Sequence, residues 1–205
     1  MNQVTPPTIG KLICIVGIDG AGKTTLINSL KSFYSTVLFT REPGGTAFAE
    51  DLRNLLFSKG SDYTPEQQMR LFFLARQDHI QSLILPAVNA GKTVISDRFD
   101  ACTFAYQRPD QHNIETLFWS LRHESVSSYI QPHYVWLKVN VDTAIQREAQ
   151  SLTHNHFDKT NRDSYLQRIA GYEQFFSKLG RSGSVVPIDA SGDAEETFSK
   201  FFSME

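Results

Sequence analysis

Residues 17–25, Gly-Ile-Asp-Gly-Ala-Gly-Lys-Thr-Thr, decide the fold. Residues 17–24 fit the pattern G-x-x-x-x-G-K-[ST], in which glycines let backbone N–H groups turn towards phosphate oxygens. Lys23 adds a full positive charge, the Thr24 hydroxyl can bind Mg²⁺, and the helix that follows adds its positive N-terminal end. We expect the loop to bind the phosphates of a nucleotide through Gly17, Ile18, Asp19, Gly20, Ala21, Gly22, Lys23, Thr24 and Thr25.

Short apolar runs alternate with helical patterns along the chain. The runs are rich in Val and Ile and do not alternate with polar residues, which is typical of strands buried on both faces. We expect strands at 11–16, 36–40, 92–96, 133–139 and 184–188. We expect helices at 23–33, 46–57, 65–89, 113–129, 142–150, 163–179 and 193–202. This order predicts an α/β fold, a five-stranded parallel sheet with helices on both faces, and ligands at the carboxyl ends of its strands.

Bulk composition excludes several classes of protein. The 205 residues have a net charge of −2, so no global basic field favours nucleic acid or anionic lipid. No apolar run is long enough to span a membrane, and the N-terminus lacks the features of a secretory signal. Two cysteines, Cys14 and Cys102, make no disulfide framework. We expect one cytoplasmic domain, 1–205, that binds neither membrane nor nucleic acid.

Arginines that follow two of the predicted strands in the sequence indicate which reaction the bound nucleotide takes part in. A guanine-binding Asn-Lys-x-Asp string is missing, since Asn161-Arg162-Asp163 follows no strand, and motor ATPases normally belong to larger assemblies. A small kinase needs a second anion site facing the first. Arg41-Glu42 and Asp97-Arg98 follow predicted strands and supply it. Asp97 is placed like the acidic residue that holds Mg²⁺, and Arg98 can grip an acceptor phosphate.

Three motifs together resemble the thymidylate kinase family. They are FTREPGGT at residues 39–46, the Asp97-Arg98 pair followed by AYQ at 105–107, and the phosphate loop. The resemblance covers residues 11 to about 191 and is weaker near 148–162. It implies a P-loop kinase architecture with a short lid at about 148–162 that converts ATP and dTMP to ADP and dTDP. It also implies Mg²⁺ dependence and a homodimer.

The resemblance assigns roles to single residues. Lys23, Arg98 and Asp19 would be catalytic. Phe72 would stack on thymine, with Arg76 one turn on and Gln107 contacting the base edge; the alternative for Phe72 is a core position. Arg53 and Arg98 would clamp the dTMP phosphate, Asp19 would lie near the 3′-hydroxyl, and Tyr106 would exclude a 2′-hydroxyl. The implied substrate contacts are Asp19, Glu42, Arg53, Phe72, Arg76, Arg98, Cys102, Thr103, Tyr106 and Gln107, and the implied magnesium contacts are Thr24, Asp97 and Glu42.

Two positions depart from the family pattern. Cys102-Thr103 replaces a Ser-Ser or Ser-Thr pair, and cysteine is the weaker hydrogen-bond donor. Gly20 lacks the basic side chain that some members carry, and members with Gly there usually have several lid arginines. Here the lid candidates are Arg147, Lys159 and Arg162. Two alternatives follow: a related nucleoside or nucleotide kinase with altered base choice, and a nucleotide-binding module with weak catalysis. His154 and His156 are expected to be solvent-exposed rather than metal ligands.

Overall fold

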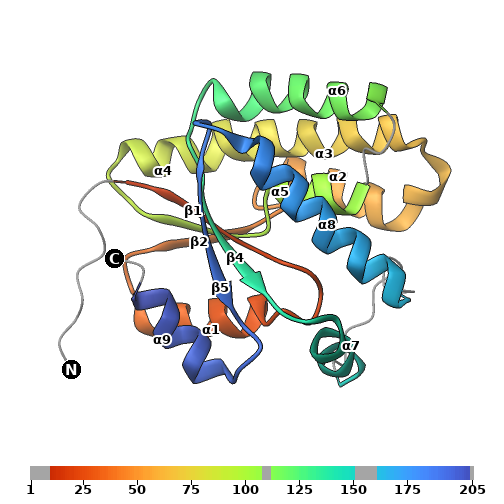
Figure 1. Cartoon of the computed structure of the whole chain (residues 1–205). Coiled ribbons are helices and arrows are strands. Elements are labelled where there is room, and N and C mark those ends of the chain that lie inside the picture. Colours follow the sequence, from red (N-terminus) through yellow and green to blue (C-terminus); the bar gives the residue numbers. More distant parts are fainter. Residues whose placement is uncertain (1–9, 108–111, 151–160, 204–205) are drawn as a thin grey trace.

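The computed structural model describes residues 10–107, 112–150 and 161–203 (Figure 1). Its centre is a parallel five-stranded sheet in the order β2-β3-β1-β4-β5. The strands are β1 (Leu12–Val16), β2 (Leu38–Arg41), β3 (Val94–Asp97), β4 (His133–Lys138) and β5 (Ser184–Asp189). The predicted α/β fold and its five strands are confirmed, with β2 and β3 each starting two residues later than expected.

The three middle strands are the most buried, as their apolar composition predicts. Cys14, Ile15 and Val16 of β1 and Val94 of β3 are inaccessible to solvent. Ile15 pairs with Asp97 and Val16 with Trp136, so the parallel strands end at one common edge. The phosphate loop and the polar residues that follow β2 and β3 therefore meet at that edge.

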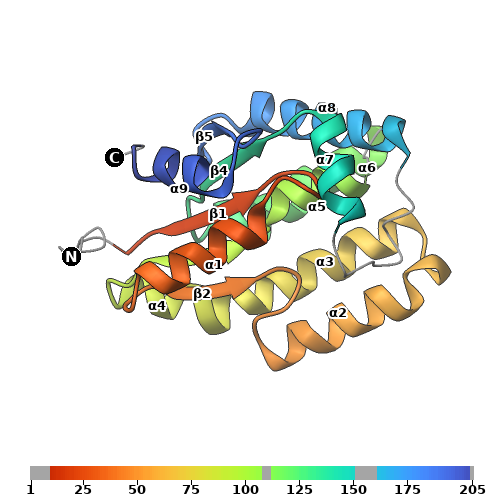
Figure 2. The same cartoon turned by 90° about the horizontal axis from the view of Figure 1, so that it is seen from below.

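Helices cover both faces of the sheet (Figures 1 and 2). One face carries α1 and α9, and the other carries α3, α4, α5, α6 and α8, while α2 packs on α3 and α7 follows β4 at the carboxyl edge. The bounds are α1 (Lys23–Phe33), α2 (Ala47–Lys59), α3 (Pro65–His79), α4 (Leu85–Asn89), α5 (Asp100–Gln107), α6 (His112–Arg122), α7 (Val141–Ala149), α8 (Arg162–Leu179) and α9 (Ala194–Phe202). Short turns η1 (Gly60–Asp62), η2 (Ile80–Ile84) and η3 (His123–Ser127) complete the elements.

The helices correct the sequence expectations in two respects. Residues 65–89 and 113–129 contain π-helical turns, η2 and η3, where continuous α-helices were expected. Helix α5 was not expected at all, although it carries several predicted site residues. The start of α3 is as predicted, since Thr64 and Gln67 form a reciprocal capping box ahead of Pro65. Among the described residues, no helix is long and apolar enough to cross a membrane.

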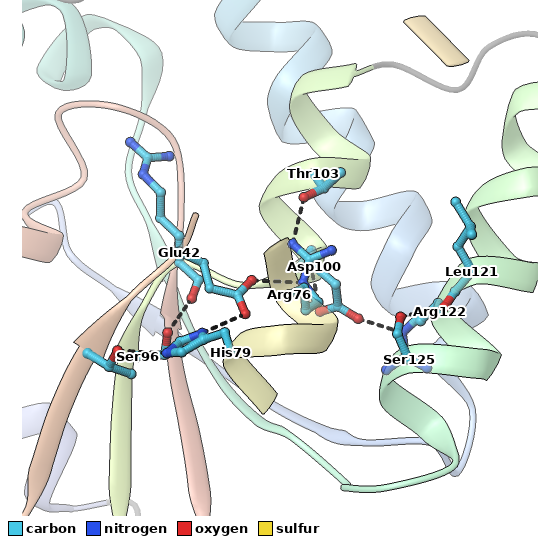
Figure 3. Close-up of polar contacts among 12 residues, drawn as sticks. Glu42, Arg76, His79, Ser96, Asp100, Thr103, Leu121, Arg122 and Ser125 are labelled. Atoms are coloured by element: carbon cyan, nitrogen blue, oxygen red, sulfur yellow. Dashed lines mark hydrogen bonds and ion pairs between the residues drawn. The ribbon is translucent and has the colours of Figure 1, made fainter. Parts of the chain in front are cut away.

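A buried ion pair anchors α5 within the aromatic core. Arg122 Nε donates to Asp100 Oδ2 at 2.6 Å, and the two side chains are 2% and 0% exposed (Figure 3). Arg122 also donates to the hydroxyls of Ser127 and Ser182 at 2.7 and 2.8 Å. The Tyr134 hydroxyl donates to the second Asp100 oxygen. Arg122 therefore ties the first residue of α5 to α6, β4 and the segment before β5.

Arg122→Met is expected to lower the free energy of unfolding by about 3 kcal/mol, because it leaves the Asp100 carboxylate buried without its counter-charge. Urea denaturation at neutral pH measures this difference. The matched control is Arg70→Met, since the exposed Arg70–Glu66 pair contributes about 0–1 kcal/mol. An Arg122→Met cost no larger than that of the control would contradict an anchoring role.

Candidate active site

The phosphate loop joins β1 to α1 at the carboxyl edge of the sheet. Gly20 and Gly22 have φ values of 73° and 88°, in the left-handed region that glycine enters at little cost. Gly22 caps α1 without a side-chain hydrogen bond, and the first turn of this described helix holds no acidic residue. The N-terminal N–H groups of α1 are therefore available to an anion, as the motif predicts.

Gly20 is pressed against the backbone of α7. A Cβ atom at this position would lie 2.3 Å from the Ala144 carbonyl oxygen and 2.8 Å from the Ala144 Cα. A basic side chain at Gly20 would therefore require α7 to move. This contact gives a physical reason why the loop has glycine, and not a basic residue, at position 20.

Lys23 is held inside the loop. Its Nζ donates to the carbonyl oxygens of Gly17 and Ile18 at 3.0 and 2.8 Å, and the side chain is 7% exposed. Burial lowers the pKa of Lys23, and the nearby charge of Arg98 lowers it further, against the opposing effect of Asp19. An anion bound here would restore the environment that favours the charged amine.

The Asp19 carboxylate joins several site residues. Its Oδ1 accepts from Arg98 Nη2 at 2.7 Å, and its Oδ2 accepts from the Tyr106 hydroxyl and from Arg168 Nη1, both at 2.9 Å. Burial alone would raise the pKa of Asp19, but the charges of Arg98, Lys23 and Arg168 outweigh it and hold the pKa well below its ordinary value. Asp19 is therefore ionised at any physiological pH.

Arg98 has an uncommon backbone conformation. Its φ of 69° lies in the left-handed region, which disfavours residues with a Cβ. The Arg98 N–H donates to the Ile15 carbonyl at 3.0 Å, and the Ser96 hydroxyl donates to the Arg98 carbonyl at 2.8 Å. These bonds to β1 and β3 hold the strained conformation, which directs the guanidinium towards the phosphate loop. Strain kept in this way is common at functional sites.

Asp97 and Thr24 fit a magnesium ion. Asp97 closes β3, and its buried Oδ1 has no hydrogen-bond partner within the described part of the chain. Asp97 and Thr24 line the same cavity. In the ranges that the structure describes, no three or more His, Cys, Asp or Glu side chains are grouped so that they could hold a metal ion by themselves. Mg²⁺ commonly uses one or two carboxylates together with substrate phosphates, so this sparse donor set suits it.

One cavity of about 740 Å³ connects the phosphate loop to the walls formed by α3 and α5. It is lined by Asp19, Gly20, Gly22, Lys23, Thr24, Thr25, Arg41, Glu42, Pro43, Arg53, Phe57, Phe72, Arg76, Asp97, Arg98, Phe99, Cys102, Thr103, Tyr106, Gln107, Arg147, Glu148 and Gln150. All predicted substrate contacts thus share one cavity. Of the predicted loop contacts, Ile18 and Ala21 belong to the buried core.

Phe72 and Phe73 have different environments although they are adjacent. Phe72 is partly exposed and lines the cavity, whereas Phe73 is 2% exposed and packs edge-on against Phe118 at 5.2 Å. The core position that was the alternative for Phe72 is thus occupied by Phe73, and the Phe72 ring can contact a ligand in the cavity.

Arg76 belongs to a second buried network (Figure 3). Its Nε donates to Glu42 Oε2 at 2.7 Å and its Nη2 donates to Thr103 Oγ1 at 2.8 Å. His79 Nδ1 lies 3.1 Å from Glu42 Oε1, and because a carboxylate only accepts, this nitrogen carries the proton. Both Glu42 oxygens are engaged by protein groups, a different role from the one expected beside Mg²⁺. Arg76 Nη1 is buried and has no partner among the described residues, so it remains available to a ligand.

The α5 wall carries Cys102, Thr103, Tyr106 and Gln107. The Tyr172 hydroxyl lies 3.1 Å both from Cys102 Sγ and from the Gly17 carbonyl oxygen, which links α8 to α5 and to the phosphate loop. On the opposite side, Arg53 donates to the Pro43 carbonyl at 2.8 Å and stacks 4.6 Å from the Phe57 ring centroid.

Two of the three lid candidates, Arg147 and Arg162, lie within the described residues. Arg147 donates to the carbonyl oxygens of Ala190, Ser191 and Gly192, at 2.8, 3.2 and 2.6 Å, and so fixes the loop after β5. Arg162 forms an exposed ion pair with Asp142. Lys159, like His154 and His156, lies outside the described residues.

Arg168 was missed by the sequence analysis. It reaches Asp19 from α8, which is 149 positions away in sequence, and its guanidinium lies 4.3 Å from the Tyr106 ring centroid. One signal was present: Arg168 stands between Tyr165 and Tyr172 at helical spacing, and both tyrosines are buried. This spacing places Arg168 on the inner face of α8.

Comparisons with known proteins agree with the site. The family model described as "Thymidylate kinase" matches residues 15–200. The thymidylate kinase of Cupriavidus necator is 36% identical over 193 residues, covering 87% of this chain and 94% of that protein. The thymidylate kinase of Janthinobacterium sp. (strain Marseille) is 35% identical over 197 residues, covering 88% and 93%. That of Nitrosomonas eutropha is 33% identical over 212 residues, covering 96% and 95%. The chain belongs to the thymidylate kinase family.

Proposed function

We propose that this chain transfers the γ-phosphoryl group of ATP to dTMP and releases ADP and dTDP. The observation that carries the proposal is a single cavity whose lining includes both Lys23 with the phosphate loop and Phe72 with Arg76. A donor triphosphate and an acceptor monophosphate can meet between these two groups, beside Arg98. Membership of the thymidylate kinase family supports the choice of acceptor.

The reaction needs positioning and positive charge more than proton transfer. A phosphate oxygen of dTMP, already anionic near neutral pH, forms a bond to the γ-phosphorus, and the bond to the bridging oxygen of ADP breaks. Lys23 and Arg98 stabilise the charge on the transferred group, and Arg53 helps to hold the acceptor phosphate. Asp19 orients Arg98 through its 2.7 Å bond.

The acceptor base and sugar would be recognised by the walls of the cavity. Phe72 stacks on the thymine ring, and the unpartnered Nη1 of Arg76 donates to a base carbonyl. Gln107, with both donor and acceptor, suits the imide edge. Tyr106 lies against the sugar and leaves no room for a 2′-hydroxyl.

Mg²⁺ is part of the proposal. Thr24 and Asp97 would hold the ion, and the buried, unpartnered Asp97 Oδ1 supports this assignment. When bound, Mg²⁺ neutralises phosphate charge. Glu42 contributes by fixing Arg76.

We also infer that the chain works as a single cytoplasmic kinase domain with a lid at about residues 148–162. One or more of Arg147, Lys159 and Arg162 would close over ATP. A homodimer is part of the same inference. Helices α2 and α3 pack on each other, and each has an exposed apolar side chain, Phe48 on α2 and Leu74 on α3, which supports an apolar contact surface on this helix pair. Light scattering at micromolar concentration tests the dimer.

The function is tested by measuring ADP release with dTMP, dUMP, dGMP, AMP and CMP as acceptors. The proposal expects the highest kcat/KM for dTMP. A preference for a purine monophosphate would refute it, and tight binding of ATP and dTMP without turnover would favour a weakly catalytic binding module.

A related kinase with altered base choice is the second candidate. It is favoured by Cys102, which lines the cavity where a serine would offer a hydroxyl, and whose sulfur accepts a hydrogen bond from the Tyr172 hydroxyl. The same acceptor panel, extended to nucleosides, separates the two candidates. Cys102→Ser should then alter the order of acceptors if Cys102 sets base choice.

Phe72→Ala is expected to weaken dTMP binding by about 1–3 kcal/mol, as measured for other aromatic side chains that stack on bases. Calorimetric titration with dTMP provides the measurement. Phe73→Ala is the matched control, since it truncates a buried ring and should lower the melting temperature with a smaller direct effect on the site. A loss of stability in Phe72→Ala equal to that in Phe73→Ala would restore the core interpretation for Phe72.

A further inference from the structure

We propose that Arg168 is a positioning residue that sets the sugar selectivity of the enzyme, by holding the Tyr106 ring and the Asp19 carboxylate in one fixed arrangement. The inference rests on the proposed function, because it takes dTMP as the acceptor whose sugar lies beside these two residues. Arg168 itself is not part of the cavity lining. It acts through residues that are.

Arg168 contacts both side chains that face the sugar. Its Nη1 donates to Asp19 Oδ2 at 2.9 Å, and its guanidinium carbon lies 4.3 Å from the Tyr106 ring centroid. The Tyr106 hydroxyl donates to the same Asp19 oxygen at 2.9 Å. Three contacts thus close a triangle, in which neither the ring nor the carboxylate can move without breaking one of them. A planar guanidinium can make the ion pair and the ring contact together.

The packing of α8 on α5 brings Arg168 to this position. A Cβ atom at Gly171 would lie 2.8 Å from the Ala105 Cα, so the two helices approach as closely as glycine allows. Gly171 is one turn beyond Arg168, and Ala105 precedes Tyr106. The Arg168 side chain is only 12% exposed, so its contacts are largely shielded from solvent.

The positive charge of Arg168 also contributes to the cluster of cations around Asp19. Asp19 faces Arg98 at 2.7 Å, Arg168 at 2.9 Å and Lys23 at 4.0 Å, so one carboxylate is opposed by three cations. The cluster therefore retains a surplus of positive charge beside the phosphate loop. With Arg168 on Oδ2, Oδ1 is the oxygen that orients Arg98, and each oxygen of Asp19 has its own arginine.

The test uses substrates that differ from dTMP by one sugar hydroxyl. kcat and KM are measured for dTMP, ribothymidine 5′-monophosphate and 3′-deoxy-dTMP with the wild-type protein, Arg168→Met and Lys178→Met. Lys178 lies on the same helix in an exposed ion pair with Glu115 and serves as the control. We expect the preference of the wild type for dTMP over both analogues to fall about tenfold or more in Arg168→Met, mainly through the KM for dTMP. The KM for ATP and all values for Lys178→Met should stay at wild-type levels.

A merely structural role predicts a different result. It lowers kcat for all three acceptors alike, or lowers only the melting temperature, and leaves the acceptor ratios unchanged; that result overturns the proposal. If Arg168→Met does not fold, the same ratios in Arg168→Lys decide, since lysine keeps the charge but cannot pair and stack at once. Unchanged ratios there also overturn it. Absence of dTMP turnover in the wild type would instead refute the proposed function.

Discussion

Lys23→Met is expected to reduce kcat by about 10³-fold, while the melting temperature stays the same or rises. The loss of turnover follows from removal of the amine that neutralises charge on the transferred phosphoryl group. The unchanged or higher stability follows from the sign of the pKa shift. Burial and the charge of Arg98 lower the pKa of Lys23. A lysine with a lowered pKa opposes folding fully wherever it is protonated in both states. This cost falls as the pH rises past the folded-state pKa and is gone above the unfolded-state pKa.

Coupled ADP-release assays and thermal melts at neutral pH measure the two effects. Lys31→Met is the matched control, because Lys31 is an exposed lysine on the same helix. It should leave both quantities near wild type. A Lys23→Met variant that is inactive because it melts much earlier would contradict the assignment of Lys23 to catalysis.

Arg98→Ala should cost about 10³–10⁵-fold in kcat/KM for dTMP, the range for an arginine that stabilises a phosphoryl transition state. Its expected effect is large because Arg98 also holds Asp19, at 2.7 Å. Arg98→Gly provides the informative comparison, since glycine accepts the φ of 69° without strain. Both variants should lose activity equally. The free energy of unfolding of Arg98→Gly should be about 1 kcal/mol higher than that of Arg98→Ala.

Steady-state kinetics and urea denaturation of the two variants give these quantities. Recovery of activity in Arg98→Gly relative to Arg98→Ala would show that the backbone, not the guanidinium, carries the effect. Arg70→Ala, in an exposed pair on α3, controls for loss of a surface arginine.

The middle strands β1, β3 and β4 were predictable because strands buried on both faces leave an apolar pattern in the sequence. The edge strands β2 and β5 are more exposed, and their Val, Leu and Ile residues still indicated strands. Helix α5 was not predictable. Its residues from Asp100 to Ala105 are buried, so the helix has no exposed polar face that would mark it as amphipathic. Its last two residues, Tyr106 and Gln107, line the cavity. The π-helical turns η2 and η3 are likewise invisible, because one extra residue per turn changes hydrogen bonding without changing composition.

In the site, the motifs located the residues near strand ends and missed those contributed by elements distant in sequence. Asp97 is the last residue of β3 and Arg98 follows it directly, so the strand-end rule located them. Phe72 and Phe73 could not be distinguished, because rotation of α3 about its axis is set by packing on Phe118 and not by local sequence. Arg168 depends on the approach of α8 to α5, which only tertiary structure reveals. Glu42 was placed correctly in the cavity, but its pairing with Arg76 and His79 could not be foreseen.

The contact between Gly20 and Ala144 constrains how this chain can change over evolutionary time. A lone Gly20→Arg substitution meets the α7 backbone at 2.3 Å, so it is harmful whatever charge it brings. A prior change that shifts α7 would make the same substitution acceptable. The order of mutations thus decides which are viable, and a further positive charge is gained more readily at exposed positions of α8 than at Gly20 of the phosphate loop.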